Sequence, residues 1–274
     1  MDAIASIILG LVQGLTEYLP VSSTAHLRVV PALLGWADPG AAWSAVVQLG
    51  TLFAVLVYFF GDLWGMAKAW VRGLIRRQPF AEQESRLAWF LILGTIPVGV
   101  FGLLFQHSIE NSLRSLWVVA SALAALALIL ALAEWRGLRN RSVGDINWLD
   151  GLLIGMAQAL ALIPGASRSG VTITAGLFLG LKRADAARFS FLLSVPAIAA
   201  SGLYELWKLA ELSPTGVPWL SVGLGTVTAA ISGYAAIAFL MRFLERRSTL
   251  VFIIYRLLLG ATIAGLLCFG LLEF

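Results

Sequence analysis

The chain has 274 residues, of which 59% are hydrophobic and only 12% are charged. A soluble domain carries about 45–50% apolar and about 25% charged residues, so this chain has too few polar side chains to cover a surface in contact with water. The composition therefore excludes a soluble protein and predicts an integral membrane protein, in agreement with a mean hydropathy of +0.89. The single cysteine, Cys268, excludes a disulfide framework and a multi-cysteine metal site.

Apolar runs divide the chain into long and short helical segments. A membrane-spanning helix needs about 20 apolar residues, and six runs approach this length: 43–60, 87–105, 116–133, 189–207, 219–241 and 250–272. Four runs are shorter: 3–19, 25–35, 149–163 and 170–181. The short runs form two pairs, each separated by a polar, proline-bearing turn. Such a turn is tolerated at membrane depth where protein buries it or where it lines a watery cavity. Each pair therefore predicts a re-entrant helical hairpin.

The basic residues predict the orientation of the helices. Segments 62–86, 134–148, 182–188 and 242–249 hold five, three, three and three Lys or Arg, whereas 106–115 and 208–218 hold one each. The positive-inside rule places the four basic segments, which we take as loops, in the cytoplasm. Because the charges lie in short segments between apolar runs, the isoelectric point near 9.6 does not predict nucleic acid as a partner. With the basic segments in the cytoplasm, we expect the first hairpin to enter the membrane from the outside and the second from the cytoplasm.

A short internal repeat supports two halves of opposite orientation. Gly10-x-x-Gln13-x-Leu15 recurs as Gly155-x-x-Gln158-x-Leu160, and Pro20-x-x-Ser23 recurs as Pro164-x-x-Ser167. The predicted fold is an all-α integral membrane protein with six transmembrane helices and two re-entrant hairpins in an inverted-topology repeat. It forms a single membrane domain, 1–274, with one repeat over about 1–133 and the other over about 149–274. Secondary transporters are also built from inverted repeats, so a lipid-phosphate transporter or flippase is an alternative to an enzyme.

Ionisable residues at membrane depth are costly, and by default they mark function. Glu17 is the only acid placed well inside an apolar run. Gln13 lies four residues before it on the same helix face, and oxygen ligands of this kind suit a hard divalent cation such as Mg²⁺ or Ca²⁺. A structural hydrogen-bonding role is the alternative for Glu17. Arg256 lies six residues inside the last run, and we interpret it as an interfacial or charge-pairing residue of little functional weight.

The turn of the first hairpin offers a nucleophile. Ser22, Ser23 and Thr24 are adjacent hydroxyls, and His26 follows three residues after Ser23, close enough to serve it as a general base or acid. In the structural alternative, Ser23 only caps the following helix. A satisfied structural role is likewise the alternative for His26.

The turn of the second hairpin is typical of an anion site. Ser167, Ser169 and Gly170 surround Arg168 at the start of an apolar helix. Backbone N–H groups, hydroxyls and a guanidinium together hold an anion such as phosphate, while a snorkelling or charge-paired arginine is the alternative. The repeat brings the two turns together, which favours chemistry on a phosphate group of a membrane-resident molecule. Zinc hydrolysis is not predicted, since the chain lacks a His-rich or Cys-rich ligand set.

Two segments carry a resemblance to a known family. QGLTEYLPVSSTAH, from Gln13 to His26, and PGASRSG, from Pro164 to Gly170, resemble the signature segments of the undecaprenyl pyrophosphate phosphatase (bacitracin-resistance) family. The resemblance extends over the whole chain in length, hydropathy and placement of the motifs. It implies hydrolysis of undecaprenyl pyrophosphate to undecaprenyl phosphate and inorganic phosphate. That reaction recycles the lipid carrier for bacterial cell-wall synthesis and confers resistance to bacitracin.

The resemblance also assigns roles by position. It implies that Ser23 attacks the terminal phosphorus, that His26 transfers protons and that Arg168 binds phosphate. We expect further contacts to phosphate from Ser22, Thr24, Ser167, Ser169, Gly170 and Thr172. The acidic motif falls on Gln13 and Glu17, so Glu17 is the one certain carboxylate for the implied divalent cation, Mg²⁺ or Ca²⁺. Direct attack by water, with Ser23 only binding, is the alternative mechanism.

The expected setting follows from the topology and the resemblance together. We expect a multi-pass protein of the bacterial cytoplasmic (inner) membrane, with its site open to the periplasmic side. The partners are the lipid bilayer and a polyprenyl pyrophosphate lipid. The oligomeric state is left open, with a homodimer as one alternative.

Overall fold

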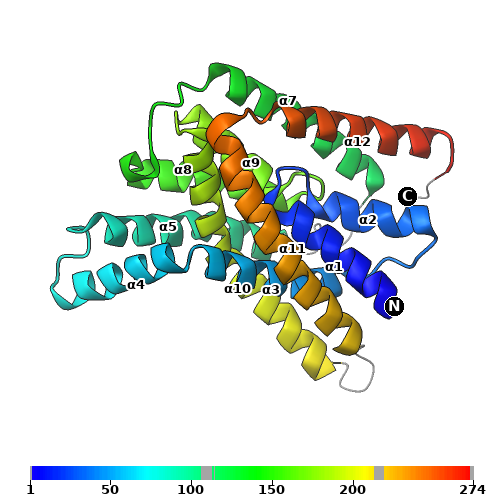
Figure 1. Cartoon of the computed structure of the whole chain (residues 1–274), viewed down its shortest axis with the longest axis horizontal. Coiled ribbons are helices and arrows are strands. Elements are labelled where there is room, and N and C mark those ends of the chain that lie inside the picture. Colours follow the sequence, from blue (N-terminus) through cyan, green and yellow to red (C-terminus); the bar gives the residue numbers. More distant parts are fainter. Residues whose placement is uncertain (1, 106–112, 114, 213–218, 272–274) are drawn as a thin grey trace.

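The computed structural model describes residues 2–105, 113, 115–212 and 219–271. Its α-helices are α1 (Ala3–Tyr18), α2 (Ser23–Leu34), α3 (Gly40–Tyr58), α4 (Phe60–Ile75), α5 (Gln83–Leu104), α7 (Leu116–Arg136), α8 (Trp148–Ala159), α9 (Arg168–Phe178), α10 (Arg183–Leu212), α11 (Trp219–Arg246) and α12 (Leu250–Cys268). Two short 3₁₀ helices, η2 (Val143–Asp145) and η3 (Leu160–Leu162), flank α8. No strand occurs within the described ranges (Figure 1). Most of segment 106–115 and residues 213–218 lie outside them.

The long helices confirm the six predicted spans. Within the described residues, α3, α5, α7, α10, α11 and α12 are the helices long and apolar enough to cross a membrane. The short apolar runs correspond to α1, α2, α8 and α9, and a turn joins the members of each pair. The chain is therefore an all-helical, multi-pass membrane protein.

The predicted loop over 62–86 is wrong, because most of it is helical. Helix α4 begins at Phe60 and packs on α5. Met66, Ala69 and Gly73, spaced three and four residues apart, form its buried side. Its other positions include charged residues, so the segment does not stand out as an apolar run. The basic segments that begin at 182 and 242 are also partly helical, since α10 begins at Arg183 and α11 continues to Arg246.

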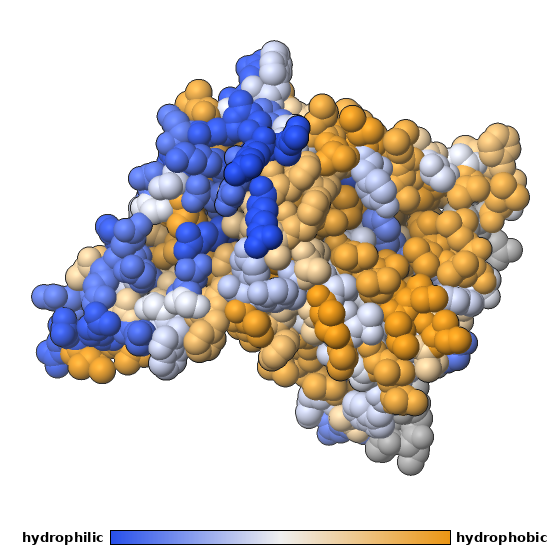
Figure 2. Space-filling view, viewed as in Figure 1, coloured by the Kyte–Doolittle hydropathy of each residue, from blue (hydrophilic) through white to orange (hydrophobic). Residues whose placement is uncertain are grey.

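The four basic segments meet on one side of the molecule. Arg188 donates to Asp62 Oδ1 (2.7 Å), and Arg183 pairs with Glu134. The hydroxyl of Thr249 also donates to Glu134, at 2.8 Å. Figure 2 shows the hydrophilic residues gathered at this side, while the opposite side of that view is mostly hydrophobic. The clustering agrees with the charge pattern from which the topology was predicted.

Hydrogen bonds of Arg141 link the first turn of α8 to the end of α9. Arg141, between α7 and α8, donates to Asp150 Oδ2 (2.5 Å) and to the carbonyl oxygen of Leu179 (2.8 Å). The hydrogen bond that Arg141 donates to the Asp150 carboxylate raises the pKa of the guanidinium above its usual value. Asn147 caps α8 by accepting from the backbone N–H of Asp150 at 3.0 Å. The start of α8 is thereby held beside the end of α9.

Glycines let the short helices cross long ones with their backbones in contact. A Cβ atom added to Gly10 of α1 would lie 2.4 Å from the carbonyl oxygen of Gly225 in α11. A Cβ atom on Gly155 of α8 would lie 2.2 Å from the carbonyl oxygen of Gly94 in α5. Small residues at such crossings permit close helix packing in membranes. Each pair of short helices therefore packs against a long helix from the other half of the chain (Figure 1).

Candidate active site

Two serines with the same unusual backbone begin the helices that follow the turns. Ser22 has φ 74° and Ser167 has φ 67°, in the left-handed region that residues other than glycine seldom adopt. Each caps its helix: Ser22 Oγ accepts from the N–H of Ala25 (3.4 Å), and Ser167 Oγ accepts from that of Gly170 (3.1 Å). By this geometry Ser22 corresponds to Ser167. The pairing of Ser23 with Ser167 in the sequence repeat is therefore wrong by one residue.

The cap assignment also removes one alternative for Ser23. Helix α2 begins at Ser23, and the residue that caps it is Ser22. The interpretation of Ser23 as only a helix cap is therefore wrong. Its hydroxyl is free to make another contact.

Glu17 is the residue through which the two turns meet. Its Oε2 accepts hydrogen bonds from Ser23 Oγ and from Gln13 Nε2, both at 2.7 Å. Its Oε1 accepts from the Arg168 guanidinium at 2.5 Å. The Glu17 side chain is only 5% exposed and that of Arg168 is 14% exposed, so this ion pair is buried. The structure thus brings together four residues that the sequence singled out.

A second contact joins the turns through the backbone. Ser169 Oγ donates to the carbonyl oxygen of Leu19 at 3.1 Å and lies 3.2 Å from Ser167 Oγ. Arg168 also donates from its other terminal nitrogen to the carbonyl oxygen of Ser194 at 3.4 Å. Because both turns are held by several bonds, the position of Arg168 relative to Ser23 is well defined.

His26 has different partners from those that its spacing suggested. Its Nδ1 donates to the carbonyl oxygen of Ser22 at 2.7 Å, and its Nε2 lies 2.6 Å from the hydroxyl of Tyr255. A carbonyl only accepts, so the neutral ring carries its proton on Nδ1 and Nε2 accepts from Tyr255. Ser23, which was expected to pair with His26, donates instead to Glu17. No local motif indicates Tyr255, which lies 229 residues away in an apolar run.

Arg256 is the second residue that sequence reasoning missed. Its side chain is fully buried, so the interpretation as an interfacial residue is wrong. Its NH2 donates to the carbonyl oxygens of Ala166 (3.0 Å) and Gly165 (3.4 Å), and its Nε donates to that of Leu123 (3.3 Å). Among the described residues its NH1 has no hydrogen-bond partner. An arginine inside an apolar run is a functional signal by itself, and here the structure gives that signal a location.

The remaining predicted residues surround this centre in different ways. Thr24 is exposed at the first turn. Thr172 is buried, and its hydroxyl donates to the carbonyl oxygen of Arg168 (2.7 Å) and contacts Ser190 Oγ (2.6 Å). Gly170 lies against Arg256, whose NH1 would be 2.5 Å from a Cβ atom added there. Gly170 therefore packs against the Arg256 guanidinium, and the Thr172 hydroxyl is hydrogen-bonded to Arg168 and Ser190.

The donor atoms suit a divalent cation that also binds substrate. No cluster of three or more His, Cys, Asp or Glu occurs in the part of the chain that the structure describes. However, Gln13 Oε1 is buried without a hydrogen-bond partner, and Glu17 accepts three hydrogen bonds where a carboxylate has about four acceptor sites. Mg²⁺ is usually held by one or two carboxylates together with substrate phosphates. One carboxylate and one free amide oxygen fit that pattern.

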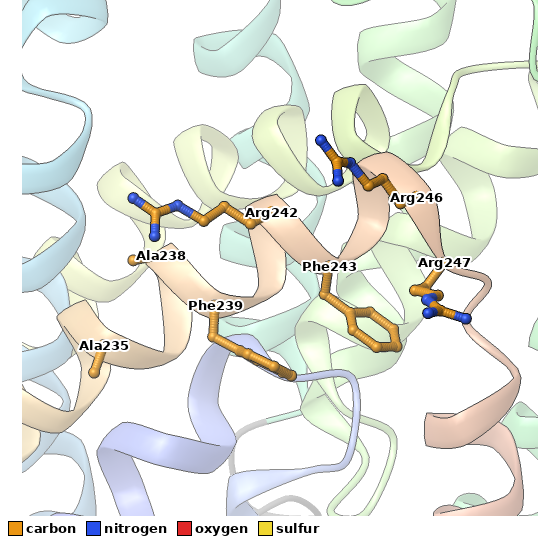
Figure 3. Close-up of a pocket in the computed structure, with 7 residues that line it drawn as sticks. All are labelled: Ala235, Ala238, Phe239, Arg242, Phe243, Arg246 and Arg247. Atoms are coloured by element: carbon orange, nitrogen blue, oxygen red, sulfur yellow. The ribbon is translucent and has the colours of Figure 1, made fainter.

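A groove of about 510 Å³ lies elsewhere, along the last turns of α11. It is lined by Ala235, Ala238, Phe239, Arg242, Phe243, Arg246 and Arg247 (Figure 3). Figure 3 shows Phe239 and Phe243 on one side of the helix, with Arg242 and Arg246 pointing to the other side. Its lining contains no nucleophile or carboxylate, and those two guanidinium groups do not converge. The groove belongs to the basic side of the molecule and is not a candidate active site.

Comparison with known proteins identifies the family to which the chain belongs. A sequence model of the family described as "Bacitracin resistance protein BacA" matches residues 6–262. An undecaprenyl-diphosphatase of Myxococcus xanthus (strain DK1622) is 56% identical over 273 residues, covering 100% of this chain and 92% of the relative. An undecaprenyl-diphosphatase of Chlorobium phaeobacteroides (strain BS1) is 53% identical over 281 residues, covering 100% of both. The chain therefore belongs to the family of the bacitracin resistance protein BacA.

Proposed function

We propose that this chain hydrolyses undecaprenyl pyrophosphate to undecaprenyl phosphate and inorganic phosphate, as the name of its relatives states. The reaction recycles the lipid carrier for cell-wall synthesis and accounts for bacitracin resistance in the family. The observation that carries the proposal is the bonding of Ser23 and Arg168 to one carboxylate, that of Glu17. A nucleophile and a phosphate-binding guanidinium are thereby each hydrogen-bonded to the same proton acceptor. The names of these relatives do not support the alternative function, a lipid-phosphate transporter or flippase.

In the first step Ser23 Oγ attacks the terminal phosphorus. The new Oγ–P bond replaces the bond from that phosphorus to the bridging oxygen, so undecaprenyl phosphate leaves. Glu17, 2.7 Å from Oγ, accepts the proton of the hydroxyl. Arg168 stabilises the charge on the oxygens of the phosphoryl group in transfer. The hydroxyls and N–H groups of the two turns contribute further hydrogen bonds.

In the second step water hydrolyses the phosphoserine and releases inorganic phosphate. Glu17 gives the proton it took from Ser23 to the departing lipid phosphate and is then the base for this water. The lone pair of His26 Nε2 already accepts from the Tyr255 hydroxyl, so His26 supports the first turn through its bond to the Ser22 carbonyl. In the alternative mechanism water attacks the pyrophosphate directly and Ser23 only binds. Rapid quenching with labelled terminal phosphate distinguishes them, since a covalent phosphoserine forms only in the first mechanism.

A divalent cation bound with the pyrophosphate completes the site. Glu17 and the free Oε1 of Gln13 would hold it, and it would neutralise charge on the substrate phosphates. Mg²⁺ and Ca²⁺ both prefer these oxygen donors. Phosphate release measured with and without a chelator tests this requirement.

The chain lies in the bacterial cytoplasmic membrane as two inverted repeats, about 1–133 and 149–274. Two observations support re-entrant hairpins. Helices α1 and α8 have 16 and 12 residues, or about 24 and 18 Å, which is short of a hydrocarbon core of about 30 Å. The glycine crossings are also reciprocal, since α1 packs on α11 and α8 packs on α5. With the basic side in the cytoplasm, the catalytic site opens to the periplasm.

The central experiment is phosphate release from undecaprenyl pyrophosphate by the purified protein in detergent. We expect turnover by the wild-type chain and loss by orders of magnitude in Ser23→Ala. The orientation is tested separately by replacing Cys268 with serine and placing single cysteines at the tip of either turn. Labelling of the first turn by an impermeant reagent from the periplasm is expected, and labelling only from the cytoplasm would reverse the orientation.

A further inference from the structure

We propose that Tyr255 and Arg256, consecutive residues of α12, are positioning residues that hold one catalytic turn each. Tyr255 acts on the first turn through His26, and Arg256 acts on the second turn through backbone carbonyls. The inference rests on the proposed function, because it concerns the geometry of the same site. Both residues lie outside the two segments that carry the family resemblance.

The first connection runs from α12 to the backbone of Ser22. The Tyr255 hydroxyl donates to His26 Nε2 at 2.6 Å, and His26 Nδ1 donates to the Ser22 carbonyl at 2.7 Å. The two rings are also stacked, with centroids 5.7 Å apart and planes within 5°. The imidazole is therefore fixed in one orientation and one tautomer. Without the hydroxyl, the ring keeps only its bond to Ser22.

The second connection runs from α12 to the residues just before Ser167. Arg256 donates to the carbonyl oxygens of Gly165 and Ala166, and to Leu123 and Ala122 of α7. Its guanidinium thus links the second turn to a span. A fully buried arginine is costly in a membrane protein, and no carboxylate lies among its hydrogen-bond partners in the described part of the chain.

Both turns need such support for the same physical reason. Ser22 and Ser167 have left-handed backbones, and a conformation of this kind in a residue other than glycine persists only when the surrounding structure stabilises it. Each strained serine directly precedes a proposed catalytic residue, Ser23 or Arg168. Adjacent residues of a helix point about 100° apart, so one helix can reach both turns.

Gly170 provides a second observation on Arg256. The Cβ atom of an alanine there would lie 2.5 Å from Arg256 NH1, and 3.1 Å from Ser167 Oγ. The Arg256 guanidinium therefore fills the space into which a side chain at position 170 would extend. If Arg256 supports the turn from this position, substitutions at the two residues must be coupled.

The first test compares two tyrosines of similar exposure. Tyr255 is 43% exposed and Tyr234 is 45% exposed, each on a membrane-spanning helix. We expect Tyr255→Phe to lower kcat at least tenfold with little change in KM, because a misplacement of about 1 Å can cost about 100-fold. Tyr234→Phe should match the wild type. In a His26→Ala background Tyr255→Phe should have no further effect. An undiminished effect in that background, or wild-type kcat in Tyr255→Phe alone, would overturn the role of Tyr255.

The second test measures stability, so its result does not depend on the proposed reaction. Melting temperatures are compared for Gly170→Ala, Arg256→Lys and the double variant. Lysine keeps the charge but removes NH1, so Gly170→Ala should lower the melting temperature by several degrees in the wild type and much less in Arg256→Lys. Gly265→Ala, on α12 with nothing near its Cβ position, is the control and should be additive with Arg256→Lys. Additive effects of Gly170→Ala and Arg256→Lys would overturn the placement of the guanidinium.

Activity of the lysine variant then separates positioning from stability. At a temperature where Arg256→Lys is fully folded, we expect a raised KM, because Arg168 is displaced from the phosphate. Unchanged KM and kcat in folded Arg256→Lys would exclude a positioning role. If wild-type protein releases no phosphate, the proposed function itself fails, and the stability coupling still reports on the geometry.

Discussion

Arg168 and Glu17 form a buried ion pair between residues 151 positions apart, with 2.5 Å between the guanidinium nitrogen and Oε1. Each belongs to a different helical pair, so this bond aligns the two halves of the site. Breaking a buried ion pair leaves an uncompensated charge and costs about 3–5 kcal/mol. Arg168 therefore has two separable effects, one on stability and one on phosphate binding.

We expect Arg168→Ala to abolish phosphate release and to lower the melting temperature. Adding Glu17→Gln should recover much of the stability, because no buried carboxylate is then unpaired, but it should not recover activity. Arg168→Lys should rescue turnover poorly, since a planar fork suits phosphate oxygens better than an ammonium does. Turnover and thermal unfolding measured on the same preparations check this, and near-normal turnover of the lysine variant would contradict bidentate phosphate binding.

Ser22 and Ser23 should respond differently to alanine. Ser23→Ala removes the proposed nucleophile and should reduce single-turnover phosphate release by orders of magnitude without loss of the cap. Ser22→Ala removes the cap of α2 and should lower stability by about 1 kcal/mol, with a smaller effect on rate. Ser22→Gly, which adopts a positive φ readily, is the control for backbone strain. A Ser23→Ala protein with near-normal turnover would rule out the covalent mechanism.

Gln13→Glu should shift the cation requirement to lower concentrations while activity is kept. The substitution adds charge beside Glu17, four residues away on the same helix face. Titration of phosphate release with Mg²⁺ and with Ca²⁺ measures the shift. Unchanged cation dependence would place Gln13 outside the cation site.

The glycine crossings predict a steric effect on stability. Gly155→Ala should destabilise the protein by about 1–3 kcal/mol, as overpacking in a filled interior does, because its Cβ atom would meet the backbone of Gly94. Gly223→Ala, where nothing lies near the added atom, should be neutral. Unfolding in detergent compares the two variants, and equal stability would mean that α8 and α5 are less closely packed.

The sequence indicated the spans and most of the candidate site because those signals are local. Apolar runs of about 20 residues mark spanning helices directly, and Glu17 and Arg168 stand out as charges among apolar or small residues. Helix α4 was missed since its buried side is narrow. The predicted partner of Ser23, His26, was also wrong. Sequence spacing relates residues along one helix, and it does not show that the Glu17 carboxylate of α1 lies beside Ser23 at the start of α2. Tyr255 reaches His26 only through tertiary packing, and no pattern within its own run distinguishes it from other apolar-run aromatics.

The packing of α1 on α11 has a consequence for biosynthesis. The hydroxyls of Ser6 and Ser221 lie 2.6 Å apart although 215 residues separate them. At a synthesis rate of about 5–20 residues per second, the ribosome needs roughly 10–40 s to make the intervening chain. During that interval α1, with the polar side chains of Gln13 and Glu17, lacks the long helix on which it mainly packs and has α2 and α3 beside it. The first helix therefore reaches its final packing only after the chain has been made as far as α11, which begins at Trp219.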